Sequence, residues 1–219
     1  MSNFDSGAAG DEHWEERGEL AWNEFDWERY LRGQAGAIIR YLRLYDEAGE
    51  RPDRIDHVAE QMDWGAADWT SEEGGETSED AADVEDEVYT LHKNPIYIAT
   101  RALYLSLTRS WEALAAEERE VPQANAVRLL VHLHRGEAEA VEAIHALDFG
   151  DFALAVTLFK RSLATLNSLL AEMQAPALGA GRAAQWREMA LPRVFDLREI
   201  WLRVIAECRD ELEQLSDEE

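Results

Sequence analysis

The chain has 219 residues, 46% of them hydrophobic and 9% aromatic, which is enough apolar material to bury one substantial core. Its formal net charge is -25, and the excess is concentrated, because residues 46–87 carry -15 whereas residues 88–206 carry no net charge. A surface this acidic repels phosphate backbones and anionic lipids, which argues against nucleic acid and membrane surfaces as partners and favours a protein with a basic surface.

The sequence predicts a cytoplasmic protein. Cys208 is its single cysteine, so no internal disulfide forms, and we expect the thiol to act as a small buried hydrophobe in a reducing compartment. Residues 1–11, which we expect to form a flexible N-terminus, turn acidic and lack the basic and apolar regions of a signal peptide. No uninterrupted apolar run reaches the roughly 18 residues that span a bilayer.

Apolar residues recur at helical spacing along most of the chain, and no stretch alternates with period two. This pattern predicts an all-α fold, an antiparallel up-down bundle of about five long helices that forms a single domain over residues 12–215, followed by an acidic tail at 216–219. Several connections are short, which favours antiparallel neighbours. In chain order, the expected helices cover residues 12–48, a short segment at 53–64, then 95–120, 122–148, 152–173 and 182–215.

Capping residues mark where several of these helices begin and end. Asn94 precedes Pro95, a pair typical of an N-cap followed by the first helical position. Gly150 and Asp151 predict a tight turn, in which the glycine ends one helix and the aspartate caps the next. Pro192 lies inside the last predicted helix, where we expect it to kink or restart the helix.

The expected helix over residues 122–148 has two apolar faces. One face carries Val127, Leu130, Val131, Ala138 and Val141. The other face carries Leu129, Leu133, Ala140, Ile144 and Leu147. A helix that is apolar on two sides is contacted from two directions, so this helix is predicted to lie at the centre of the bundle.

Residues at about 65–80 are acidic, contain glycine and have few apolar side chains, which predicts a mobile loop. Two Asp-Trp pairs lie near its start, Asp63-Trp64 and Asp68-Trp69. Tryptophan is enriched at the energetic centres of protein interfaces, so these four residues are the candidate partner-binding residues. The alternative is that both tryptophans fold back onto the bundle.

The strongest candidate for a metal site is the pair Glu142 and His145, which stand one helical turn apart. This spacing resembles the Glu-x-x-His motif of ferritin-like carboxylate-bridged metal bundles, and the resemblance implies these two residues as ligands. Glu24 is a candidate third ligand for a different reason, since it falls on the same helical face as Leu20, Leu31 and Leu42. That family needs a second such motif, which the sequence lacks, so we assign no metal ligand. In the alternative, His145 is a hydrogen-bonded core histidine and Glu24 pairs with an arginine.

Signatures of catalysis are weak. The acidic run over residues 72–76 resembles that of the all-α nucleotide pyrophosphatases, which hold magnesium between carboxylates of two helices. Two glycines in this run break the helix that has to present the carboxylates, and no acidic residue lies between Glu87 and Glu112 to supply a second cluster. No Gly-x-Ser-x-Gly motif, glycine-rich phosphate loop or paired-cysteine site occurs either, so we assign no catalytic residue.

These observations favour a non-enzymatic protein-interaction module that needs no cofactor and binds a protein with a basic surface. Formation of a homodimer is a further expectation. Two alternatives from other classes stay open. The first is a metal-binding bundle that uses Glu142 and His145, and the second is a helical protein with a small-ligand pocket between its helices.

Overall fold

The computed structural model describes residues 23–65, 94–117 and 119–217, and these residues are almost entirely helical, without a strand, which confirms the predicted all-α class. The elements are α2 (Glu24–Ala48), α3 (Arg54–Gln61), α4 (Pro95–Ala115), α5 (Gln123–Asp148), α6 (Phe152–Met173), the 3-10 turn η3 (Pro176–Leu178) and α7 (Gly181–Asp217). The predicted flexible N-terminus and most of the predicted mobile loop lie outside the described residues, as do Asp68 and Trp69. None of the described helices is long and apolar enough to cross a membrane.

The chain divides into two compact units, residues 1–36 and residues 37–219. α2 begins in the first unit, where Asn23 caps it: the Asn23 side-chain oxygen accepts a hydrogen bond from the backbone N–H of Phe25 at 2.8 Å. The Asp26 carboxylate in turn accepts from the backbone N–H of Asn23 at 3.1 Å, which completes a reciprocal cap. The rest of α2 belongs to the second unit.

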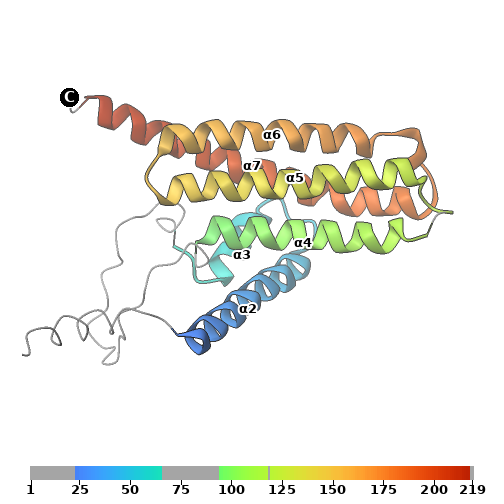
Figure 1. Cartoon of the computed structure of the whole chain (residues 1–219), viewed down its shortest axis with the longest axis horizontal. Helices are drawn as coiled ribbons and strands as arrows, with labels where there is room; N and C mark the ends of the chain where they lie inside the picture. The colour runs from blue at the N-terminus through green and yellow to red at the C-terminus, as the bar shows by residue number, and fades with distance from the viewer. Residues whose placement is uncertain (1–22, 66–93, 118, 218–219) are drawn as a thin grey trace, which may run out of the picture. The chain divides into compact units, whose positions relative to one another are not determined.

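Four helices of the second unit form an antiparallel bundle (Figure 1). α4 contacts α5 and α7, and α6 contacts the same two helices, so each helix packs against its neighbours in the chain and α7 closes the square against α4. Short connections between successive helices enforce this up-down order. The largest fully buried side chains come from all four helices and from α2: Trp111, Trp201, Tyr41, Tyr104, Phe159, Ile96, Leu103, Leu107, Leu129, Leu133, Ile144 and Leu166.

The predicted cap at Asn94 and the predicted turn at Gly150 are confirmed, whereas the helix predicted over residues 95–120 ends earlier, at Ala115. The Asn94 side chain accepts hydrogen bonds from the backbone N–H groups of the first turn of α4, at 2.8 and 3.3 Å, with Pro95 at the first helical position. Gly150 adopts a left-handed φ of 74°, and the Asp151 carboxylate accepts from the backbone N–H of Leu154 at 2.9 Å. The glycine therefore reverses the chain and the aspartate starts α6.

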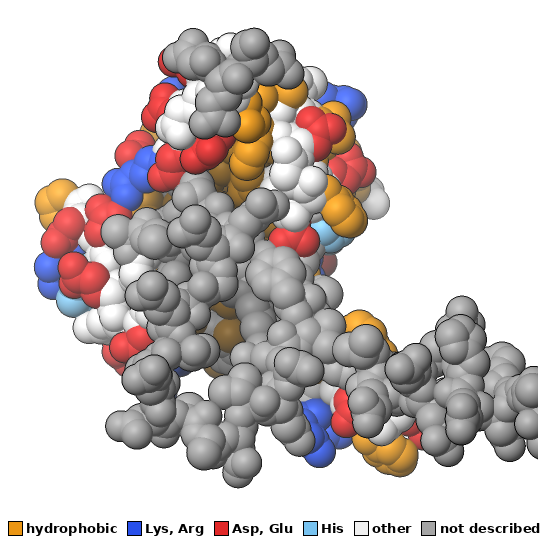
Figure 2. All heavy atoms as spheres, turned by 90° about the vertical axis from the view of Figure 1, so that its left-hand side faces the viewer, with side chains coloured by type: hydrophobic (Ala, Val, Ile, Leu, Met, Phe, Trp, Pro, Cys, Tyr) orange, Lys and Arg blue, Asp and Glu red, His pale blue; other side chains and the backbone are white. Residues whose placement is uncertain are grey.

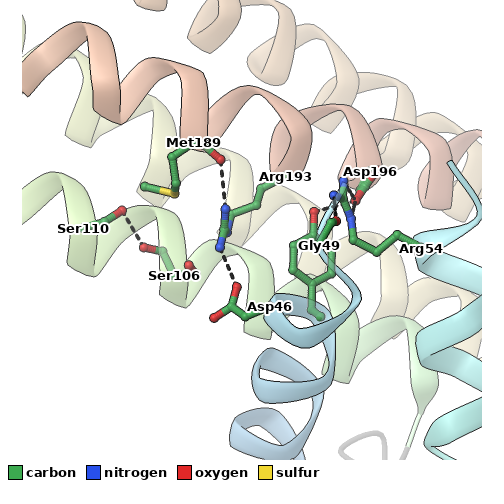
Figure 3. A network of polar contacts seen from close by, with 9 residues as sticks. Asp46, Gly49, Arg54, Ser106, Ser110, Met189, Arg193 and Asp196 are labelled. Carbon is green, nitrogen blue, oxygen red and sulfur yellow. Dashed lines mark hydrogen bonds and ion pairs between the residues drawn. The ribbon is translucent and has the colours of Figure 1, made fainter. Parts of the chain in front are cut away.

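Pro192 does not restart the last helix, contrary to one of our expectations. α7 runs without a break over 37 residues with Pro192 inside it. Proline removes one backbone donor from the helical ladder and leaves nearby carbonyl groups short of a partner. The carbonyl that loses its donor is that of Glu188, four residues before Pro192, and the Arg193 guanidinium donates a hydrogen bond to the next carbonyl, that of Met189, at 2.9 Å (Figure 3).

α5 is not buried on both sides, which corrects the prediction that it lies at the centre. Its second predicted face, which includes Leu129 and Leu133, is buried in the core. Its first face looks outward, because Val127 and Val131 are 54% and 55% exposed. Helical periodicity identifies an apolar face but does not say whether another helix of the same chain covers it.

Gly136 allows α4 and α5 to approach closely. A Cβ atom at this position would lie 2.5 Å from the hydroxyl oxygen of Tyr104 and 3.5 Å from a methyl group of Thr165. The Tyr104 side chain is fully buried, so its ring has little freedom to move away. Glycine is therefore required here by the packing of the two helices.

We expect Gly136→Ala to lower the free energy of unfolding by about 1–3 kcal/mol, because overpacking outweighs the roughly 1 kcal/mol gain in helix propensity. Urea unfolding followed by circular dichroism measures the change. Gly33→Ala is the matched control, because Gly33 also lies inside a helix but a Cβ atom there has no neighbouring atom within 4 Å. Equal or greater stability of Gly136→Ala than of the parent chain would contradict the packing argument.

Candidate functional site

One carboxylate connects α2, α3 and α7. Asp196 on α7 accepts two hydrogen bonds from the Arg54 guanidinium at the start of α3, at 2.8 and 2.6 Å, and one from the Tyr45 hydroxyl of α2 at 2.5 Å (Figure 3). The same guanidinium donates to the Gly49 carbonyl at 2.6 Å and lies over the Tyr45 ring. Both charged side chains are largely buried, at 10% and 17% exposure, so water screens their attraction only weakly.

A second ion pair stands next to this junction. Arg193 of α7 donates to the Asp46 carboxylate of α2 at 2.6 Å and also lies near the Tyr45 ring (Figure 3). Burial, followed by the hydrogen bond to Asp196, raises the pKa of Tyr45, so the hydroxyl stays protonated and keeps its role as a donor. The junction therefore fixes α3 and the end of α2 on one side of α7.

A pocket of about 380 Å³ lies between α3 and α7. Its apolar lining consists of Ile55, Ala59, Trp64, Ile200 and Val204. Apart from Trp64, which is partly exposed, these side chains are buried and form the floor. Residues on each helix recur at intervals of four, so one apolar strip of α3 faces one apolar strip of α7 across the pocket.

Charged residues complete the lining of the pocket, three of them acidic and one basic. Arg203 is the basic residue, and its guanidinium pairs with Asp56 across the pocket and with Glu199 on its own helix. Its charge is therefore compensated within the chain. Glu60 and Glu207 are left as the carboxylates that give the pocket its acidic character.

Glu207 is the unusual member of this set. One of its carboxylate oxygens is buried and has no hydrogen-bond partner within the described part of the chain. Burial raises the pKa of Glu207, and the proximity of Arg203 only partly opposes this effect. A buried acceptor without a donor costs free energy, so a ligand that brings a cation or an N–H group to this oxygen is favoured.

Asp63 and Trp64, two of the predicted partner-binding residues, lie at the end of α3. Asp63 has a left-handed φ of 64°, and the backbone N–H of Trp64 donates to the Ala59 carbonyl at 3.0 Å, as in a Schellman motif. This turn directs the Trp64 ring back onto Tyr41, with ring centroids 5.7 Å apart. Trp64 therefore folds back and at the same time forms one wall of the pocket.

The residues of the metal hypothesis do not form a core site. Glu142 and His145 are both exposed on α5, whereas the ligands of a carboxylate-bridged bundle lie in its interior. Glu24 is exposed at the start of α2. Across residues 23–65, 94–117 and 119–217, no three His, Cys, Asp or Glu side chains are grouped so that they could hold a metal ion.

Two other buried groups, Glu139 and Cys208, have surroundings that indicate a structural role. Burial raises the pKa of Glu139, but hydrogen bonds from Thr165 at 2.5 Å and Arg135 at 2.8 Å outweigh it, so on balance the pKa is lowered. Burial and the neighbouring Glu207 carboxylate raise the pKa of the Cys208 thiol to about 11. A thiol that stays protonated at neutral pH is a poor nucleophile, as expected for a structural cysteine.

Comparison with protein-family models, with curated proteins and with solved structures finds no match to this chain. The α3/α7 pocket is therefore the candidate site on its own geometry. Sequence reasoning identified its Trp64 wall but missed the α7 side. Ile200, Val204 and Glu207 follow one another at intervals of four and three, and this second strip of α7 was the available signal.

We expect Asp196→Ala to lower the free energy of unfolding by about 3–5 kcal/mol, because it leaves the Arg54 guanidinium buried without a counter-charge. Guanidinium chloride unfolding measures the loss. Asp56→Ala removes an exposed ion pair and serves as the matched control, with an expected cost below about 1 kcal/mol. If the two variants lost similar amounts of unfolding free energy, the contact between Arg54 and Asp196 would not contribute more to stability than an exposed ion pair.

The raised pKa of Glu207 predicts a pH-dependent effect of Glu207→Gln. A carboxyl group with a raised pKa in the folded state costs nothing below its unfolded pKa of about 4.3, and the cost grows until the pH exceeds the folded pKa, above which it stays constant. The variant should therefore be more stable than the parent chain at neutral pH, by less than about 1 kcal/mol because the group is partly exposed. This advantage should disappear near pH 4.

Urea unfolding at the two pH values measures this difference, and Glu213→Gln, at an exposed position of the same helix, serves as the control. A Glu207→Gln variant that is less stable than the parent chain at neutral pH would mean that the carboxylate makes a stabilising interaction.

Proposed function

We propose that this chain is a non-enzymatic protein-interaction module whose α3/α7 pocket takes an apolar side chain from a basic segment of a partner protein. The observation that carries the proposal is an apolar floor bordered by carboxylates, one of which has a buried oxygen without a donor. A partner segment with one apolar anchor flanked by lysine or arginine complements both features.

The apolar floor supports an anchored interaction. The floor of the pocket is apolar and therefore unfavourably hydrated, since it is formed by Ile55, Ala59, Ile200 and Val204. The volume of about 380 Å³ is large enough for a bulky side chain. Trp64 adds an aromatic wall, a residue type enriched where interfaces are most strongly bound. An amphipathic helix presents such an anchor at intervals of three and four residues.

The charges around the pocket select the partner. Glu60 and Glu207 have no arginine of this chain within ion-pair distance among the described residues, whereas Asp56 is paired with Arg203. Figure 2 views the bundle from the end at which α4 and α6 begin, and acidic side chains lie among hydrophobic ones on this face. The carboxylates that line the pocket therefore attract a basic segment and repel an acidic one.

The proposal includes the absence of catalysis and a cytoplasmic location. The pocket holds no pair of an activated nucleophile and a base, because its titratable residues are three carboxyl groups and one arginine. The buried thiol of Cys208 suits a reducing compartment. Nucleic acid stays an unfavourable partner because of the net charge of -25.

We expect a fluorescent amphipathic helical peptide of leucine and lysine to bind the full chain, and the same peptide with glutamate in place of lysine not to bind. Fluorescence anisotropy measures the affinity. Replacing Glu60 and Glu207 by glutamine should weaken binding about tenfold, since two charges that face the peptide are lost. Binding should also weaken as salt is added.

Glu112→Gln combined with Glu188→Gln is the matched control, because it removes the same charge at exposed positions away from the pocket. If both double variants lose affinity equally, the peptide binds the acidic surface in general and the proposed pocket is wrong. If a primary alkylamine binds the pocket and the peptide does not, the site is a small-ligand pocket and the protein-partner proposal fails.

A further inference from the structure

The outer face of α5 carries a stripe of valine, alanine and histidine with coiled-coil spacing, which no other helix of the described residues covers. Its members follow one another at alternating intervals of four and three: Val127, Val131, His134, Ala138, Val141 and His145. Five of them are exposed and Val141 is partly exposed. α5 packs against α4 and α6 (Figure 1), and the exposure of the stripe places it on the side of α5 that these two helices leave open. This heptad spacing is what a second helix needs in order to pack along α5.

The stripe is complementary to itself when two copies meet in antiparallel orientation. With the two-fold axis at Gly136, Val131 of one copy faces Val141 of the second copy, and the bulky His134 faces the small Ala138 of the second copy. The same register places Val127 opposite His145 of the second copy. Every position of the stripe therefore has a counterpart, as an isologous interface requires.

Charges at the edge of the stripe agree with the same register. Arg128 and Glu142 each directly follow a valine of the stripe, on the same side of the helix, and both are exposed. In the antiparallel pair, Arg128 of one copy lies beside Glu142 of the second copy, and symmetry repeats the contact. A parallel pair would not bring these two opposite charges together.

The position of α5 in the charge pattern also favours contact between copies. Residues 88–206, which include the whole helix, carry no net charge, whereas the acidic excess lies before and after them. α5 itself carries two arginines and four acidic residues, a net charge of -2, so the repulsion between two facing α5 helices is small beside that expected from the total charge of -25.

We infer that a second copy of this chain docks on the outer face of α5, and that the two copies form an antiparallel, two-fold symmetric homodimer through Val127 to His145. The surface is separate from the α3/α7 pocket, so the dimer and the binding of a basic partner stand or fall independently.

Cysteine cross-linking of the full chain tests the register. Neither Val131→Cys nor Val141→Cys alone should form a cross-linked dimer under mild oxidation. In the antiparallel pair, the introduced cysteine lies about 15 Å along the helix axis from the same position of the second copy, which is too far for a disulfide. A mixture of the two single variants should form a dimer that is cross-linked between position 131 and position 141. Because each single variant retains Cys208, it also shows whether Cys208 forms intermolecular disulfides.

Sedimentation equilibrium tests the interface without oxidation. The parent chain should approach twice its monomer mass as concentration rises, and Ala138→Glu should weaken the dimer at least tenfold because it buries a carboxylate at the axis. Ala206→Glu, at an exposed position of α7, is the matched control and should leave the dimer unchanged. Circular dichroism confirms that both variants fold.

Reversing the charges at positions 128 and 142 distinguishes dimerisation in one specific register from non-specific association. Arg128→Glu or Glu142→Arg alone should weaken the dimer, and the two changes together should restore it, because the pair is then re-formed with its signs reversed. A parent chain that stays monomeric at every concentration would overturn the inference. So would efficient cross-linking of Val131→Cys alone, which indicates a parallel pair.

Discussion

The ion pair between Arg54 and Asp196 is the interaction on which the arrangement of the candidate site depends. α3 is a short helix of eight residues, too short to be stable without tertiary contacts. The buried guanidinium is held by a carboxylate on α7 and by a carbonyl at the end of α2, so the helix is fixed at its first residue. Together with the buried apolar side chains of α3, this contact holds the apolar strip of α3 opposite that of α7, where the two strips enclose a pocket.

The distribution of charge separates the two interaction surfaces of the molecule. The α3/α7 pocket is bordered by carboxylates, and its α3 side belongs to residues 46–87, which carry a net charge of -15. A basic segment therefore complements it. The outer face of α5 lies in the neutral stretch and is apolar, so it suits a contact between like-charged copies. The proposed homodimer and the proposed binding of a basic partner therefore use different helices.

Helical periodicity predicted the bundle, because apolar residues at helical spacing on α4, α6 and α7, such as Leu107, Phe159 and Trp201, are buried in its core. Local signals also gave the cap at Asn94 and the turn at Gly150. The contact between Arg54 and Asp196 joins residues far apart in the sequence, and no local pattern marks such a pair. The prediction that α5 is covered on both faces was wrong for a related reason. The sequence spacing of an apolar face is the same whether that face packs into the core of its own chain or stays exposed.

The most direct test of the proposed site is methyl NMR of the full chain, labelled at isoleucine and valine and titrated with the leucine–lysine peptide. The account predicts that the largest chemical-shift changes occur at Ile55, Ile200 and Val204, which line the pocket. Val127 and Val131 on the far surface should change little. Small changes spread over many methyl groups, with none concentrated at the pocket, would contradict it.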